Sequence, residues 1–227
     1  MAEKPAALPA LLLVLTITTG LIDAVSVLGL GRVFTANMTG NIVFLGFALA
    51  GVPGFSARRS LAALAAFLFG AVIGGRLGLR LDGSRRRWLL MVAVVESSLL
   101  FAAALTARGY DSERLVPVVQ LYALITLTAV AMGIRNATVR RLAVPDLTTT
   151  VLTLTLAGLA ADSPLAGGNS PRWRRRVASV VAMLGGAIVG GWLVLRGGLG
   201  WPLVLTGTIT LTTTLGYVAH LAAGGET

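Results

Sequence analysis

Six long apolar runs dominate this sequence and limit what the chain can fold into. They cover residues 8–19, 61–73, 88–105, 116–132, 177–195 and 201–222. With their flanks, these runs approach the ~20 residues that an α-helix needs to cross a bilayer. The chain has 227 residues, of which only 12% are charged, and its mean hydropathy is +0.84. Because the connections are short, the sequence predicts an all-α integral membrane protein with a single membrane domain.

Three strings of the first half return in the same order in the second half. They are Gly-x-x-Asp/Asn-Ala at 20–24 and 133–137, Asn/Asp-x-Thr at 37–39 and 146–148, and Gly-Ala-x-x-Gly-Gly at 70–75 and 186–191. Paired arginines at 58–59 and 174–175 precede the last string with the same 116-residue offset. The sequence therefore predicts one repeat at about 8–80 and another at about 115–196, with a connecting helix at about 88–107 and a closing helix at about 200–222.

Two short apolar segments, 38–50 and 147–160, decide the topology. Their 13 and 14 residues fall below the ~17 that a crossing helix requires. If both segments cross, the halves are parallel and nine Lys/Arg lie on each side. If both are re-entrant, twelve lie on the cytoplasmic side and six outside, as the positive-inside rule favours. The expected fold is thus an inverted structural repeat in the bacterial inner membrane, with six full transmembrane helices, two re-entrant or broken half-helices and both termini cytoplasmic.

Polar residues at the starts of these half-helices are the first candidates for a binding site. They are Asn37, Thr39, Asn41, Asp146, Thr148 and Thr149. Asn37 and Asp146 stand where an N-cap is expected, and local capping alone would account for them. Half-helices entering from opposite sides would also bring their N-termini together near the midplane, where free N–H groups favour an anion or a polar solute. Asp146 argues against a purely anionic preference.

Ionisable residues within the apolar runs are the second set of candidates, because an intramembrane charge is costly unless it is paired or hydrated. Asp23 corresponds in the repeat to Asn136, which follows Arg135. An Asp23–Arg135 pair is the simplest expectation, and snorkelling of Arg135 to the cytoplasmic interface is the alternative. Glu96, in the middle of its run, is the best candidate for a proton carrier. A neutral carboxyl that only packs against a neighbouring helix is the other interpretation of Glu96.

Several functional classes lack the residues they would need. The chain has no Cys and a single His, His220, so neither a metal cluster nor a buried catalytic histidine is expected. No enzyme activity and no cofactor are predicted. The net charge of +10 comes from arginines at helix ends, a pattern that indicates contact with the lipid bilayer rather than nucleic acid.

Small and hydroxylated residues on the apolar helices have structural interpretations. The Gly-x-x-x-Gly spacings at 70–74 and 186–190 favour close packing within the bundle, and a homodimer through these Gly-rich helices is the alternative. The threonines between 206 and 214 are expected to bond their own i−4 carbonyls.

The strings quoted above resemble those of the YoaK family, also called the domain of unknown function 1275 or UPF0700 family. The resemblance rests on Gly-x-x-Asp-Ala at 20–24, Phe-x-Ala-Asn-Met-Thr-Gly-Asn at 34–41, and Pro-Asp-Leu-x-Thr-Thr-Val at 145–151. It covers nearly the whole chain and implies a bacterial multi-pass inner-membrane protein. Many members carry Gln where this chain has Arg135.

Two functions fit these observations. The preferred hypothesis is a small secondary transporter or channel that moves an unknown small polar or anionic solute, with or without protons, through a midplane site at the half-helix starts. The alternative is a non-transporting membrane scaffold, lipid-interacting or partner-subunit protein whose broken helices are purely structural.

Overall fold

The computed structural model describes residues 7–145, 147, 149 and 152–223, and within these residues the fold contains helices and no strand. The helices are α1 (Ala7–Gly29), α2 (Met38–Leu49), α3 (Ala57–Arg80), α4 (Arg85–Thr106), α5 (Val118–Leu142), α6 (Thr153–Ala161), the 3-10 helix η1 (Pro164–Ala166), α7 (Trp173–Gly197) and α8 (Gly200–Ala223). The six long ones are apolar enough to span a membrane and coincide with the six apolar runs. The prediction of an all-α multi-pass membrane protein is confirmed.

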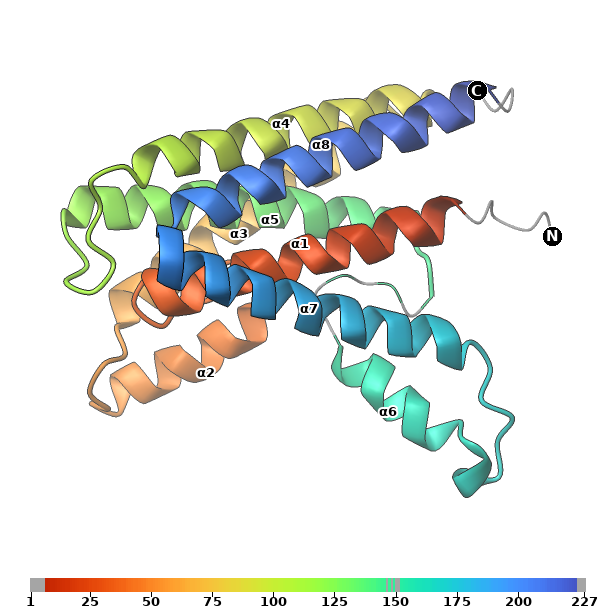
Figure 1. Ribbon diagram of the computed structural model, residues 1–227, viewed down its shortest axis with the longest axis horizontal. Helices are drawn as coiled ribbons and strands as arrows, with labels where there is room; N and C mark the ends of the chain where they lie inside the picture. Colours follow the sequence, from red (N-terminus) through yellow and green to blue (C-terminus); the bar gives the residue numbers. More distant parts are fainter. Residues whose placement is uncertain (1–6, 146, 148, 150–151, 224–227) are drawn as a thin grey trace.

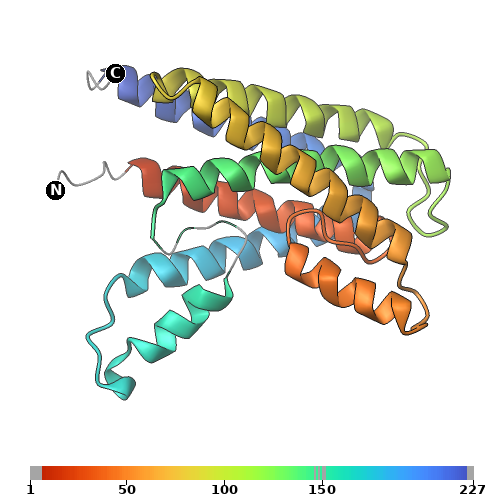
Figure 2. The same ribbon diagram turned by 180° about the vertical axis from the view of Figure 1, so that it is seen from behind.

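The two short helices lie outside the bundle of long ones (Figure 1). α2 has 12 residues and α6 has nine, which gives lengths of roughly 18 and 14 Å at 1.5 Å per residue. α2 begins near the middle of the bundle and ends beside the end of α1, whereas α6 begins in the middle and runs toward the other end (Figure 1). α2 packs on α3, as Figure 2 shows from behind, and α6 packs on α7 and η1.

The long helices associate in three main pairs, α1 with α7, α3 with α5 and α4 with α8. Glycines allow two of these pairs to approach closely. A Cβ on Gly186 of α7 would clash with the carbonyl oxygen of Ile17 on α1, and a Cβ on Gly70 of α3 would clash with that of Val130 on α5. The two contacts correspond in the repeat, because Gly186 is the counterpart of Gly70 and Ile17 is the counterpart of Val130. These glycine faces are therefore used for close packing within the chain, as the Gly-x-x-x-Gly spacings predict.

A polar layer crosses the bundle at mid-length, between two apolar clusters. One cluster includes Leu12, Val92 and Leu221 at the end where α1 begins and α8 ends. The other includes Leu100 and Leu203 at the opposite end. Glu96, Arg135 and Thr210 are all buried between them. Because Glu96 and Thr210 lie near the centres of α4 and α8, this layer falls at the midplane of a bilayer spanned by the bundle.

Candidate functional site

The turn that leads into α2 is held by two asparagines. Asn37 is the N-cap, and its side-chain oxygen accepts from the N–H of Gly40 at 3.4 Å. Asn41 is fully buried; its Oδ1 accepts from the N–H of Phe34 at 2.9 Å while its Nδ2 donates to the carbonyl of the same residue. The Phe34 ring stacks on Phe44, with ring centroids 5.4 Å apart. Asn37 therefore caps α2 as predicted, whereas Asn41 is occupied in fixing the turn and is not free to bind a solute.

The start of α6 differs from the sequence-based expectation. α6 begins only at Thr153, and its N-cap is Leu152, which offers no capping side chain. Asp146 therefore does not stand at the N-cap of this helix; Asp146 and Thr148 themselves lie outside the described residues. Thr149 is buried and has a left-handed backbone with φ of 60°. The segment between α5 and α6 is longer than that between α1 and α2. The Asp-Leu-Thr string therefore lies before the start of α6, although the matching Asn-Met-Thr string marks the start of α2.

A pocket of about 410 Å³ lies between the first turns of α2 and α6. Its described lining consists of Asn37, Thr39, Gly40, Val43, Leu152, Thr153, Leu156 and Met183. Thr39 and Thr153 are exposed, one on each short helix. None of these lining residues is charged, so the polarity of the pocket comes from an amide, two hydroxyls and the free N–H groups of two helix starts. The first turns of the two short helices thus border the same pocket, and Thr153 lines it from α6.

Arg135 is the centre of the polar layer and is 1% exposed. Its Nη2 donates to Glu96 Oε1 and, at 2.8 Å, to Thr210 Oγ1. Its Nη1 donates to Thr18 Oγ1 at 2.7 Å, with the Thr19 hydroxyl at 3.4 Å. One guanidinium on α5 thereby joins α1, α4 and α8. A chamber of about 20 Å³ beside it has room for about one water molecule.

The expected Asp23–Arg135 pair does not form, and Arg135 does not snorkel to the interface. Arg135 instead contacts Glu96 on α4 and Thr18 and Thr19 on α1. Glu96 is therefore the ion-pair partner of Arg135. Asp23, half-buried on α1, has a buried Oδ1 without a hydrogen-bond partner. Of the two intramembrane carboxylates among the described residues, Asp23 is the one without an ion-pair partner.

Asn136 lies away from both features. Its Nδ2 donates to the carbonyl of Met132 at 2.8 Å, and it lines a separate pocket of about 700 Å³ between α3 and the end of α5. The structure thus brings together Glu96 with Arg135, and Asn37 with Thr39, but it does not unite all the predicted residues in one site.

Sequence reasoning missed the hydroxyl ligands of Arg135. Among the α8 threonines, Thr206 does bond its i−4 carbonyl, at 2.7 Å, as predicted, but Thr210 accepts from Arg135. Thr18 and Thr19 belong to a Thr-rich stretch of α1 whose only sequence signal was hydroxyls near the middle of an apolar run. Thr153 and Met183, which line the short-helix pocket, had no distinguishing signal.

Comparisons with known proteins agree on one family. The family model described as "Protein of unknown function (DUF1275)" matches residues 11–216. The UPF0700 transmembrane protein YoaK of Bacillus subtilis (strain 168) is 37% identical over 154 residues, which cover 67% of this chain and 65% of that protein. The match thus spans slightly less than two thirds of this relative's length. No solved structure matches the chain.

Proposed function

We propose a transport function for this chain, which belongs to the DUF1275 family of multi-pass membrane proteins. In this proposal the protein is a small channel or secondary transporter that moves a small polar or anionic solute past the starts of α2 and α6. The observation that carries the proposal is the pocket between these two helix starts, lined by Asn37, Thr39 and Thr153. Irregular backbone at membrane depth is tolerated where it is buried in protein or lines a water-filled cavity, and short-helix N-termini at mid-depth are a recurring way to build a transport site.

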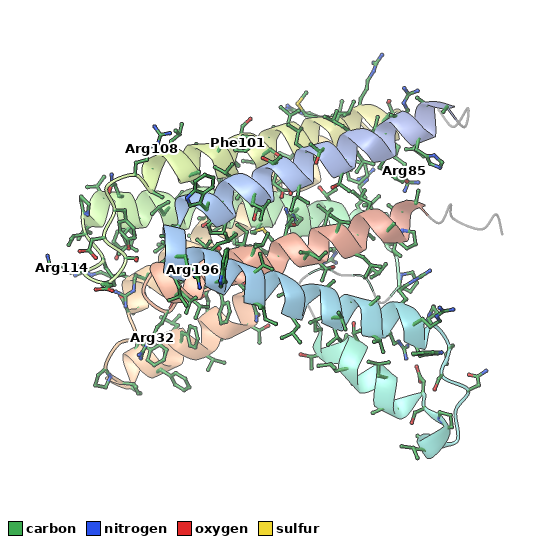
Figure 3. All side chains as sticks on the ribbon, viewed as in Figure 1. Arg32, Arg85, Phe101, Arg108, Arg114 and Arg196 are labelled. Carbon is green, nitrogen blue, oxygen red and sulfur yellow. The ribbon has the colours of Figure 1, made fainter. Side chains whose placement is uncertain are left out.

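An inverted repeat is part of the proposal. It is supported by the opposite directions of α1 and α5 (Figure 1) and by the corresponding glycine contacts of the two halves. Both short helices are too short to cross the ~30 Å hydrocarbon core, and each returns toward the end of the bundle from which the chain approached it (Figure 1). Arg85 lies at the end where α1 begins and α8 ends, and Arg108, Arg114 and Arg196 lie at the other (Figure 3). The end where α1 begins also holds Arg80, Arg86, Arg87, Arg140, Arg141 and Arg174–Arg176, at the termini of α3, α4, α5 and α7. It is therefore the more basic end and is assigned to the cytoplasm in this proposal.

The chemistry of the pocket favours a small neutral, zwitterionic or weakly anionic solute. Two helix N-termini present partial positive charge, but no described lining residue carries a full charge that would hold a strong anion. Glu96 is held by Arg135 away from this pocket, so proton coupling, if the solute requires it, falls to Asp23. The rival function, a scaffold whose short helices are purely structural, predicts a dry pocket instead.

Aqueous reagents are expected to reach the pocket in Thr39→Cys and Thr153→Cys, each the only cysteine of its chain. A small membrane-impermeant thiol reagent applied to proteoliposomes should label both, because the proposed path is hydrated. Val72→Cys and Ile188→Cys are matched controls, since both side chains are over half exposed on long apolar helices and face lipid in this arrangement. Labelling of Thr39→Cys and Thr153→Cys as slow as in these controls would reject transport in favour of the scaffold.

The loops that follow the two short helices should lie on opposite sides of the membrane. Val52→Cys, after α2, is expected to react with an impermeant reagent on intact cells, and Leu165→Cys, after α6, only once the membrane is permeabilised. Val52 is 41% exposed and Leu165 fully exposed, so access within the protein does not limit either reaction. Labelling of both cysteines from the same side contradicts the inverted arrangement.

A further inference from the structure

A second pocket, of about 640 Å³, lies at the end of the bundle opposite to the start of α1. It is enclosed by the end of α4, the α4–α5 connection and the junction of α7 with α8. Because helix ends meet there, the pocket sits at the expected membrane–water interface. It shares no lining residue with the pocket between α2 and α6.

The wall that faces the membrane interior is apolar. Phe101 and Leu105 line it from α4, and Val204 lines it from α8. The Phe101 ring lies against Gly207, where a Cβ would come within 2.8 Å of it, so this wall is a fixed part of the α4–α8 seam. Leu105 and Val204 are 58% and 41% exposed, and the apolar wall therefore continues onto the lipid-facing surface.

The rim toward water offers hydrogen-bond donors. Arg108 is exposed at the end of α4 (Figure 3), and its guanidinium has no ion-pair or hydrogen-bond partner among the described residues. Ser112 and the indole of Trp201 line the same rim. No Asp or Glu stands among the described lining residues; the nearby Asp111 carboxylate accepts from the N–H groups of its own loop at 2.9 Å and lies 3.8 Å from Arg114.

Tyr110 lines the pocket between the apolar wall and the rim. Its hydroxyl donates to the carbonyl of Gly29 at 3.1 Å, which ties the α4–α5 connection to α1. Burial raises the pKa of Tyr110 to about 12, so the ring adds no negative charge at neutral pH. The first N–H groups of α8, beside Gly198 and Trp201, also border the pocket and lack helical acceptors.

We propose that this pocket binds an anionic phospholipid. Its phosphate would lie between Arg108 and the start of α8, and its acyl chains would follow Phe101, Leu105 and Val204 toward the membrane interior. A charged donor rim joined to an apolar wall open to lipid matches a molecule with a phosphate at one end and hydrocarbon at the other. A soluble anion would leave the apolar wall unused, and a zwitterionic lipid would bring its own cation next to Arg108.

Lipid titration in neutral detergent tests this proposal, with binding followed by native mass spectrometry. Phosphatidylglycerol should bind, and Arg108→Gln should weaken its binding by about tenfold, since a hydrogen-bonded charge contact contributes about that much affinity. Arg114→Gln is the matched control, because Arg114 lies in the same connection, is 83% exposed and does not line the pocket; its effect should stay below about twofold.

Three outcomes overturn the proposal. The first is equal binding of phosphatidylcholine, which would remove the preference for negative charge. The second is competition by inorganic phosphate at the concentration of the lipid, which would identify a soluble-anion site. The third is an equal loss in Arg108→Gln and Arg114→Gln. None of these results bears on the pocket between α2 and α6, so the transport proposal is judged separately.

Discussion

Glu96→Ala is expected to destabilise the protein by about 3–5 kcal/mol, because it leaves the Arg135 guanidinium buried without its counter-charge. Both side chains are at most 2% exposed, and a guanidinium cannot lose its charge by releasing a proton. The remaining contacts of Arg135, to threonine hydroxyls on α1 and α8, do not neutralise it. Equilibrium unfolding in mixed micelles measures the change in free energy of unfolding.

Two further variants separate the ion pair from simple loss of packing. Arg135→Leu should be less harmful than Glu96→Ala, at about 1–3 kcal/mol, because a carboxyl left alone can take up a proton. Glu96→Leu combined with Arg135→Leu should recover part of the loss, since apolar groups of similar volume replace buried ion pairs well. Glu113→Ala is the control, as Glu113 is an exposed carboxylate in the α4–α5 connection. If Glu96→Ala lowers the free energy of unfolding no more than Glu113→Ala does, the ion pair does not stabilise the bundle.

The spans were predictable because length and hydropathy alone determine them. A helix that crosses lipid must be long, apolar and internally hydrogen-bonded, so the six runs translate directly into α1, α3, α4, α5, α7 and α8. The start of α2 was also predictable, since the Asn37 side chain supplies a local capping signal. The start of α6 was not, because Leu152 carries no such signal.

The partner of Arg135 could not be read from the sequence, since it depends on which helices lie side by side. Repeat symmetry predicted Asp23, the counterpart of Asn136, as the partner of Arg135. The structure instead pairs Arg135 with Glu96, from the connecting helix that lies outside either repeat. This pairing depends on the three-dimensional packing of α5 against α4, and no local sequence pattern near position 96 or 135 indicates it. The same reason hid Thr210, whose hydroxyl was indistinguishable from its neighbours on α8.

The second large expected effect is a loss of stability when a glycine at a close helix–helix contact is replaced by alanine. Gly186→Ala and Gly74→Ala should each destabilise the protein by about 1–3 kcal/mol or more through overpacking. A Cβ on Gly74 would lie 2.8 Å from the carbonyl oxygen of Ile134, and one on Gly186 would meet that of Ile17 even more closely. Backbone atoms cannot rotate away as a side chain can, so α3 and α5, or α7 and α1, must separate along their contact.

The adjacent glycines are the matched controls for this experiment. A Cβ on Gly185 or Gly75 meets no heavy atom within 4 Å, so Gly185→Ala and Gly75→Ala should be neutral or slightly stabilising, because Ala is the better helix former. Thermal unfolding in detergent compares the four variants. Losses at both Gly74 and Gly186 are expected, with the larger loss at Gly186, because a Cβ there would lie closer to the facing backbone. A loss at Gly185 or Gly75 as large as at its neighbour would mean that these helices pack on a different face, and the α1–α7 and α3–α5 pairs would have to be rotated.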